Sequence, residues 1–249
     1  MKKLLTVLLG ILMVLSLAGC GGKQEDSEPV EEMSDPCPTA ANTYADYVAA
    51  ANDTELELLM SVQAHESWWD GKVTVYAQDD DGAYLCYDMA ADEATANAMT
   101  PGTLIRVKGY KAEWSGELEL ADATCEIIAG GCDGKVYEAE DLTSLIGNND
   151  ELAKHMNKKS LFKNLTVVEY KYNWDGSGTR DDSDIYLYLT DENGTPITFT
   201  VRRYLTDNTT EVYKAVEALQ AGDVVDLTAF LYWYEEPQAR IIEVVKSVK

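Results

Sequence analysis

Residues 55–88 read ELELLMSVQAHESWWDGKVTVYAQDDDGAYLCYD, and this stretch decides the fold. Apolar and polar residues alternate from Leu56 to Ala64, a period of two that is typical of a half-buried strand. Two more strand-like runs follow, Val73–Gln78 and Ala83–Asp88, and the turn between them is rich in acid and glycine, as a hairpin requires. The stretch therefore predicts three consecutive strands.

Around this stretch the pattern continues in both directions. A short helical pattern at Tyr44–Ala51 precedes it. A helical segment follows it, and then the turn at residues 99–102 opens a strand over Thr103–Glu113. A last strand is expected over Glu117–Ile128. The predicted order is strand, strand, strand, helix, strand, strand.

The second half of the chain repeats this order, which indicates a duplicated unit. In both halves the first strand ends in Trp-Asp-Gly, at Trp69-Asp70-Gly71 and at Trp174-Asp175-Gly176. The helix of the second half is expected to be capped by Asn208, three residues before Glu211. The predicted strands of this half are Leu161–Tyr172, Ile185–Thr190, Ile197–Arg203, Asp223–Trp233 and Ala239–Val248, after a leading helical pattern at Leu145, Leu152 and Met156.

This element order is that of an OB-fold, a five-stranded barrel with a helix between its third and fourth strands. We therefore expect a mainly β protein with two tandem OB-fold barrels, each with a short leading helix, over residues 39–134 and 135–249. The sequence MTPGTLIRVKGY at residues 99–110 resembles the OB-fold modules of exported bacterial proteins, in which such a phrase starts strand four. The match is looser in the second half, where Ala229 replaces the expected glycine.

The N-terminal residues indicate where in the cell the protein is located. Lys2 and Lys3 precede an apolar run that ends in Leu17-Ala18-Gly19-Cys20, and this ending resembles the lipobox of bacterial lipoproteins. The resemblance implies a signal peptide over residues 1–19, a lipidated Cys20 and attachment to the extracytoplasmic face of the cell membrane. The alternative is an ordinary signal peptide that is cut nearby. The acidic, proline-containing residues 20–38 are expected to form a disordered linker.

The whole chain thus resembles the tandem OB-fold lipoproteins of Gram-positive bacteria, a family without an established activity. The chain carries 20 basic and 44 acidic residues, a formal charge of −24, which becomes −26 without Lys2 and Lys3. Such a charge argues against nucleic acid as a partner. It leaves neutral glycans, small molecules, cations and proteins as ligands.

Four cysteines remain when Cys20 is lipidated, which permits one or two disulfides in an exported protein. Cys86 and Cys125 lie in strand-like runs, and for this pair we favour free, buried thiols. For Cys37 and Cys132 both states stay open.

All five tryptophans fall in the loops that border the ligand face of an OB-fold, namely the loop between strands one and two and the loop between strands four and five. The predicted ligand-binding residues are Trp68, Trp69, Trp114, Tyr84, Tyr87, Trp174 and Trp233. The alternative is that Trp-Asp-Gly only builds a turn, with the tryptophan as a lid on the barrel. Because neighbouring residues on a strand point in opposite directions, Trp68 and Trp69 are not both expected to be buried, and Trp68 is the favoured exposed member of this pair. We expect Trp68, Trp114 or both to expose a ring face beside Tyr84 or Tyr87.

Catalytic and metal-binding patterns are weak. Asp79, Asp80 and Asp81 offer oxygen ligands, but contiguous acids lack the alternating spacing of a calcium loop. His65 and His155 have no evident catalytic partner in the sequence. We expect no cofactor and no enzymatic activity, and predict a binding protein for a glycan or small molecule. The alternatives are a protein–protein assembly module and, less favoured, a metal-dependent hydrolase or nuclease.

Overall fold

A computed structural model describes residues 37–129, 132, 134–173 and 183–247. The contacts divide the chain into two units, Met1–Ser34 and Asp35–Lys249, and the features below belong to the second unit. The predicted signal peptide, Cys20 and nearly all of the linker lie outside the described residues. In the described part no helix has both the length and the apolar character that crossing a membrane requires.

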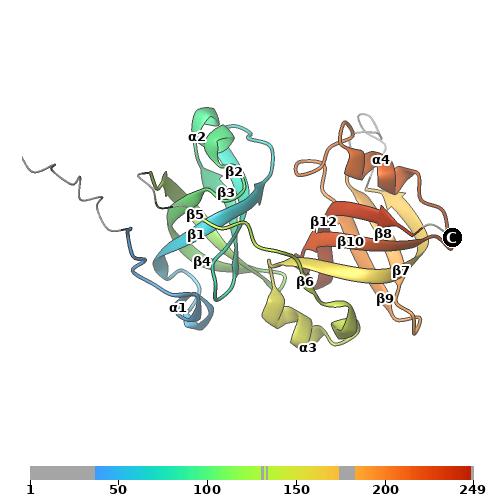
Figure 1. The fold of residues 1–249 in the computed structure, drawn as a ribbon. Helices are drawn as coiled ribbons and strands as arrows, with labels where there is room; N and C mark the ends of the chain where they lie inside the picture. The colour runs from blue at the N-terminus through green and yellow to red at the C-terminus, as the bar shows by residue number, and fades with distance from the viewer. Residues whose placement is uncertain (1–36, 130–131, 133, 174–182, 248–249) are drawn as a thin grey trace, which may run out of the picture. The chain divides into compact units, whose positions relative to one another are not determined.

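The first half of this unit is a closed five-stranded barrel (Figure 1). Its strands pair in the order β1-β2-β3-β5-β4, with β1 and β4 closing the ring and β3 parallel to β5. This is the pairing order of the predicted OB-fold. Its elements are α1 (Tyr44–Ala49), β1 (Glu55–His65), β2 (Lys72–Gln78), β3 (Ala83–Ala90), α2 (Glu93–Ala98), β4 (Leu104–Trp114) and β5 (Glu117–Ile127).

Local sequence explains these boundaries. Asp92 caps α2 by accepting a hydrogen bond from the backbone of Thr95. Between β1 and β2, Trp69 and Lys72 exchange both backbone hydrogen bonds around Asp70 and Gly71, which have φ values of 48° and 81°. Two positive φ values in a two-residue turn are what Asp-Gly provides in a hairpin. The turn chemistry expected of Trp-Asp-Gly is therefore present in the first half.

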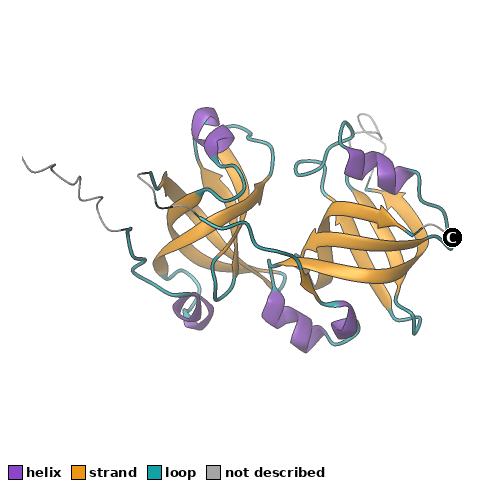
Figure 2. Cartoon of the chain, in the orientation of Figure 1, coloured by secondary structure: helices purple, strands orange, loops and turns teal. Residues whose placement is uncertain are grey.

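Strands of the second half form another sheet (Figure 2). Their order in it is β10-β12-β9-β8-β7-β6. β10 also pairs with β7, and β9 runs parallel to β12, so that the pairings of the first barrel recur here. Its elements are β6 (Glu140–Asp141), η1 (Thr143–Leu145), α3 (Asn149–Leu152), η2 (Ala153–His155), β7 (Lys159–Tyr172), β8 (Ile185–Thr190), β9 (Pro196–Val201), α4 (Glu211–Glu217), β10 (Val224–Phe230), β11 (Trp233–Tyr234) and β12 (Glu236–Lys246).

Two predicted details of this half are wrong. The helix α4 is capped by Thr210, whose side chain accepts from the backbone of Tyr213, and not by Asn208. Thr210 is the residue directly before the first helical position, and that position places a side-chain oxygen within reach of the free backbone N–H groups. The predicted strand over Asp223–Trp233 is divided between β10, which ends at Phe230, and the short β11.

The two halves share a small apolar cluster, which we call the junction. Tyr76 on β2, Leu85 on β3 and Phe230 at the end of β10 are each at most 1 % exposed, and the rings of Tyr76 and Phe230 stack with centroids 4.6 Å apart. The backbone adds contacts, because Ser67 donates to the carbonyl of Tyr204 at 2.6 Å. Part of the outer face of β2 and β3 is therefore covered by the second half.

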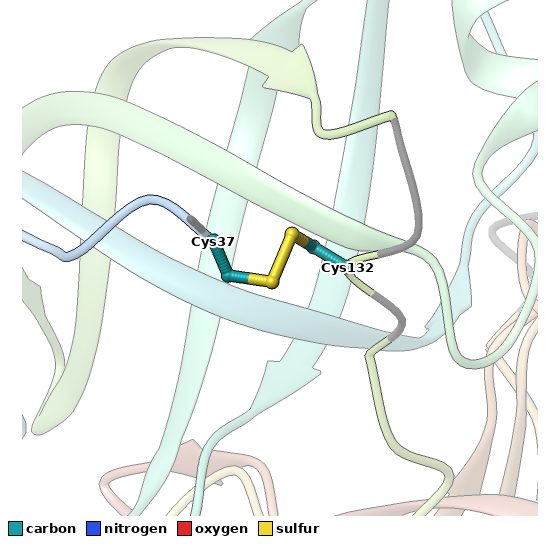
Figure 3. Close-up of a disulfide and its surroundings, with 2 residues drawn as sticks. All are labelled: Cys37 and Cys132. Atoms are coloured by element: carbon teal, nitrogen blue, oxygen red, sulfur yellow. A yellow bond between two sulfur atoms is a disulfide. The ribbon is translucent and has the colours of Figure 1, made fainter. Parts of the chain in front are cut away.

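One disulfide joins Cys37 to Cys132, with their Cα atoms 5.6 Å apart (Figure 3). It ties the segment before α1 to the segment after β5, so it encloses the whole first barrel. Cys86 and Cys125 are free, as predicted, and Cys86 is buried in the barrel core.

Candidate functional site

An aromatic cavity of about 320 Å³ lies beside the junction. We call it the groove. The first half contributes Tyr87 from β3 and Trp114 from the end of β4, with 45 % and 62 % of their surface exposed. The second half contributes Tyr186, Tyr232 and Tyr234. Rings from both halves therefore line one cavity.

Two guanidinium groups lie among these rings. The Arg202 Nε donates to Glu66 at 3.2 Å and its Nη1 to Asp184 at 3.0 Å. Burial alone lowers the pKa of Arg202, but the two carboxylates raise it above its ordinary value. Arg202 is therefore charged and already paired.

Arg240 on β12 is placed differently. Its guanidinium carbon lies 3.9 Å from the centroid of the Tyr232 ring, in a cation–π contact. Its Nε is buried and has no hydrogen-bond acceptor. The rest of the guanidinium hydrogen-bonds to the Tyr232 side chain and lies near enough to the buried Glu117 to lower the pKa of that group, but Arg240 belongs to none of the ion pairs among the described residues. Arg240 therefore gives the groove a positive charge without an ion-pair partner. A guanidinium of this kind favours planar anionic partners.

Strand geometry decides which predicted residues reach this site. Tyr84 and Tyr87 are three residues apart on β3, so they point to opposite faces of the strand. Tyr87 lines the groove. Tyr84 is fully buried in the barrel core, where its hydroxyl donates to Asp79. The prediction of Tyr84 as a ligand-binding residue is therefore wrong.

The tryptophans divide in the same way. Trp69, at the tip of the turn, is 78 % exposed, whereas Trp68 packs against the barrel core and its Nε1 donates to the carbonyl of Ala91 at 2.8 Å. The expectation that Trp68 is the exposed member of the pair is wrong, because this hydrogen bond holds its ring as a lid. Trp114 is exposed in the groove, as expected.

Trp233 is 8 % exposed and belongs to the core of the second half, so its predicted role as a ligand-binding residue is not supported. Its ring packs on Gly116, where a Cβ atom would lie 2.8 Å from Cδ1 of the indole. Gly116 also has a φ of 91°, which favours glycine. Trp233 thus holds the two halves together. Trp174 lies outside the described residues.

A buried carboxyl group reinforces this contact. Glu117, fully buried at the start of β5, accepts from the Asn157 side chain at 2.6 Å and from the backbone N–H of Trp233 at 2.7 Å. Burial raises the pKa of Glu117 to about 8, although these two hydrogen bonds lower it. Nothing in the sequence indicates this role, because acidic residues flank many turns of the chain.

The acidic turn does not bring its carboxylates together as metal ligands. Asp79 accepts from the backbone of Asp81 and Gly82 within the turn, and Asp80 accepts from Lys135 and Tyr137. Within the described ranges no group of three or more His, Cys, Asp or Glu side chains is arranged to hold a metal ion.

Sequence reasoning missed the two arginines. It gave neither Arg202 nor Arg240 a place among the ligand-binding residues. Arg202 instead reaches across to Glu66 of the first half, and Arg240 points into the groove. A pattern of alternating residues places Arg240 on one face of β12 but does not show what that face opposes.

Neither the family models nor the curated proteins give a match to this chain. Among solved structures, it is similar to a murine DNA-binding protein bound with double-stranded DNA, at 12% identity and a TM-score of 0.35, over 78% of this chain and 97% of that chain. It is also similar to the HINa domain of Ifi202 in complex with 20-bp double-stranded DNA, at 12% identity and a TM-score of 0.34, over 79% and 96%. A third neighbour is the single-stranded DNA-binding protein of Thermus aquaticus, at 10% identity and a TM-score of 0.29, over 80% and 95%. These are OB-fold proteins.

Two predictions are corrected at this point. The neighbours are DNA-binding proteins, which contradicts both the expected glycan or small-molecule ligand and the exclusion of nucleic acid. The exclusion rested on the summed charge of the chain. At physiological salt, charges more than about 8 Å apart are largely screened, so the groups inside a site count for more than the total. Glu66, Asp184, Arg202 and Arg240 leave the groove without a net charge.

Proposed function

We propose that this protein binds single-stranded nucleic acid in the groove. The observation that carries the proposal is the gathering of exposed Tyr87, Trp114 and Tyr234 around the unpaired guanidinium of Arg240. Aromatic rings stack on bases whatever the base is, and an arginine pairs with a phosphate. The ligand therefore has flat aromatic groups and a repeated negative charge.

The position of the groove supports the same ligand. OB-folds bind oligonucleotides on the face of strands two and three, between the loops that follow strands one and four. In the first barrel β2 and β3 provide that face, and Trp114 stands at the end of β4. We further propose that the second half is also an OB-fold that arose by duplication. Its β8 and the β10–β12 connection contribute Tyr186 and Tyr232 to the same groove.

The energies set the expected affinity. Each stacked base contributes about 1–3 kcal/mol, and the cost of association offsets much of this. With three exposed rings and one unpaired guanidinium, we expect dissociation constants in the micromolar range or weaker. One or two phosphate contacts give a slope of about −0.7 to −1.4 in a plot of log K against log salt concentration.

Titration of fluorescently labelled dT8 with the full chain, followed by anisotropy, tests the proposal. Wild-type protein is expected to bind with micromolar affinity and a shallow salt slope. Trp114→Ala and Arg240→Gln should each weaken binding by at least about fivefold, because each removes one stacking or phosphate contact.

Tyr110→Ala is the matched control, since Tyr110 is 41 % exposed and does not line the groove. It should bind like wild type. A complete lack of binding would contradict the proposal. So would equal losses in Tyr110→Ala and Trp114→Ala, or binding only to a labelled basic peptide, which the net charge of −24 would also attract.

We also propose that the protein acts without catalysis and is held at the extracytoplasmic membrane surface by lipidated Cys20. The support for the anchor is the Leu17-Ala18-Gly19-Cys20 sequence and the acidic residues after it. Cys20→Ala is expected to release the protein from the membrane fraction in a detergent-partition assay. Unchanged membrane association of this variant would contradict the proposed anchor, but it would not bear on the proposal that the groove binds nucleic acid.

A further inference from the structure

A second cavity, of about 200 Å³, adjoins the groove. Glu66, Thr74, Tyr87 and Arg202 line both cavities, so the two are continuous across these residues. The second cavity adds Trp69, the most exposed tryptophan among the described residues, at 78 %. Its side toward the second half is formed by Arg202 and Tyr204.

The second cavity, like the first, holds aromatic rings and charged groups, but both cations that line it are paired with carboxylates. The Arg202 and Arg203 guanidinium carbons lie 4.7 Å and 4.6 Å from the centroid of the Tyr204 ring, so cationic groups again accompany aromatic ones. Lys72 and Asp88 also line this cavity and form an ion pair at 3.5 Å. Aromatic rings and cations thus recur at the two ends of the outer face of β2 and β3.

The rings stand in an order along this face. Trp114 lies at the end of β4, Tyr87 on β3 and Trp69 in the turn before β2. Tyr87 lines both cavities, and it is the ring that a strand leaving the groove would meet before Trp69. The ion pairs of Arg202 with Glu66 and Asp184 fix the surface between them.

We propose that the two cavities form one continuous path for a single strand, with the groove as the first subsite and the Trp69 cavity as the second. This inference rests on the proposed function and adds the course of the bound segment and the number of subsites it occupies. A strand that is long enough passes from Trp114 over Tyr87 to Trp69. A short strand occupies the groove alone, where the unpaired Arg240 holds a phosphate.

Comparison of two strand lengths tests the path. The dissociation constants of labelled dT4 and dT12 are measured by anisotropy on wild type, Trp69→Ala and the control Tyr110→Ala. Because dT12 offers more binding registers than dT4, it binds more tightly on statistical grounds alone. The deciding quantity is therefore the dissociation constant for dT4 divided by that for dT12. This ratio is compared between wild type and Trp69→Ala.

We expect the wild-type ratio to be at least about fivefold larger than that of Trp69→Ala, the gain from one stacked base. The affinity for dT4 should agree within about twofold between these proteins, and Tyr110→Ala should keep the wild-type ratio. Equal ratios in wild type and Trp69→Ala, or an equal loss for both strands, would overturn the path while the groove still binds. Failure of wild type to bind either strand would overturn the proposed function together with the path.

Discussion

The junction and the groove occupy the same two strands, yet their side chains have opposite surroundings. On β2 and β3, Tyr76 and Leu85 are buried against Phe230, while Tyr87 stays 45 % exposed a short distance along β3. The ligand face of the first barrel is therefore divided. One part holds the second half in place, and the other part is left open between the two halves.

This difference separates two uses of aromatic residues that look alike in the sequence. A buried ring contributes transfer free energy to folding, whereas an exposed ring contributes little and is available for stacking. Junction variants should therefore change the free energy of unfolding, and groove variants should change affinity. The predictions below test this separation, from the largest expected effect on stability to the smallest.

Phe230→Ala should lower the free energy of unfolding by about 3–5 kcal/mol, because it removes a fully buried ring that stacks on Tyr76. Urea denaturation measures the loss. Tyr110→Ala, at an exposed position, serves as the control and should change stability by less than about 1 kcal/mol. A loss below about 1 kcal/mol in Phe230→Ala would show that the junction does not stabilise the fold.

Glu117 should make stability depend on pH. Its pKa of about 8 lies above the ordinary value of 4.5, so the folded state holds the proton more tightly than the unfolded state. The contribution of this proton to the free energy of unfolding is fully present below about pH 4.5. It is lost as the pH rises toward 8, which lowers the free energy of unfolding by up to about 4 kcal/mol. Urea denaturation across this range should show the fall in wild type.

Glu117→Gln should flatten that profile, and Glu113→Gln, at an exposed position on β4, should leave it unchanged. If stability rises through the same window in wild type and not in Glu117→Gln, the carboxylate form is the stable one. The hydrogen bonds from Asn157 and Trp233 would then outweigh the effect of burial.

Arg202→Met tests the border between the two regions. It leaves the side chains of Glu66 and Asp184, which are 10% and 11% exposed, without their cation, so we expect a loss of about 1–3 kcal/mol. Adding Glu66→Gln should recover part of that loss, because one uncompensated charge is removed. Strictly additive losses in the double variant would mean that the ion pair does not couple the two halves.

Trp114→Ala should have the smallest effect on stability, below about 1 kcal/mol, because its ring is 62 % exposed. Trp68→Ala is the matched comparison and should lose about 2 kcal/mol or more, since its ring packs on the core and its Nε1 is hydrogen-bonded. Thermal melts of the two variants measure the difference. Equal losses would mean that Trp114 is also a structural lid.

Much of the fold was predictable because it follows from alternation and turn chemistry. The predicted strand Ile185–Thr190 coincides with β8, and most other strands differ from prediction by a few residues at their ends. The free thiols of Cys86 and Cys125 followed from their strand-like surroundings. The position of the groove was predictable only in part, since Trp114 and Tyr87 were expected there and Arg240 was not.

The remaining errors have a common physical cause. Whether Trp68, Tyr84 or Trp233 is exposed depends on what packs against it, and that partner is far away in the sequence. Trp233 is covered by Gly116 of the other half, and Trp68 is held by the carbonyl of Ala91. Local patterns give the direction of a side chain but not the surface opposite it.

Photo-cross-linking tests the central claim most directly, because it reports which rings contact the bases. A single strand of eight 5-bromodeoxyuridine nucleotides is irradiated with the full chain, and the modified peptides are identified by mass spectrometry. Our account predicts cross-links at Trp114 and Tyr87, which disappear when unlabelled dT8 is added in excess. Cross-links confined to exposed aromatic residues away from the groove, such as Tyr110, or none above background, would contradict it.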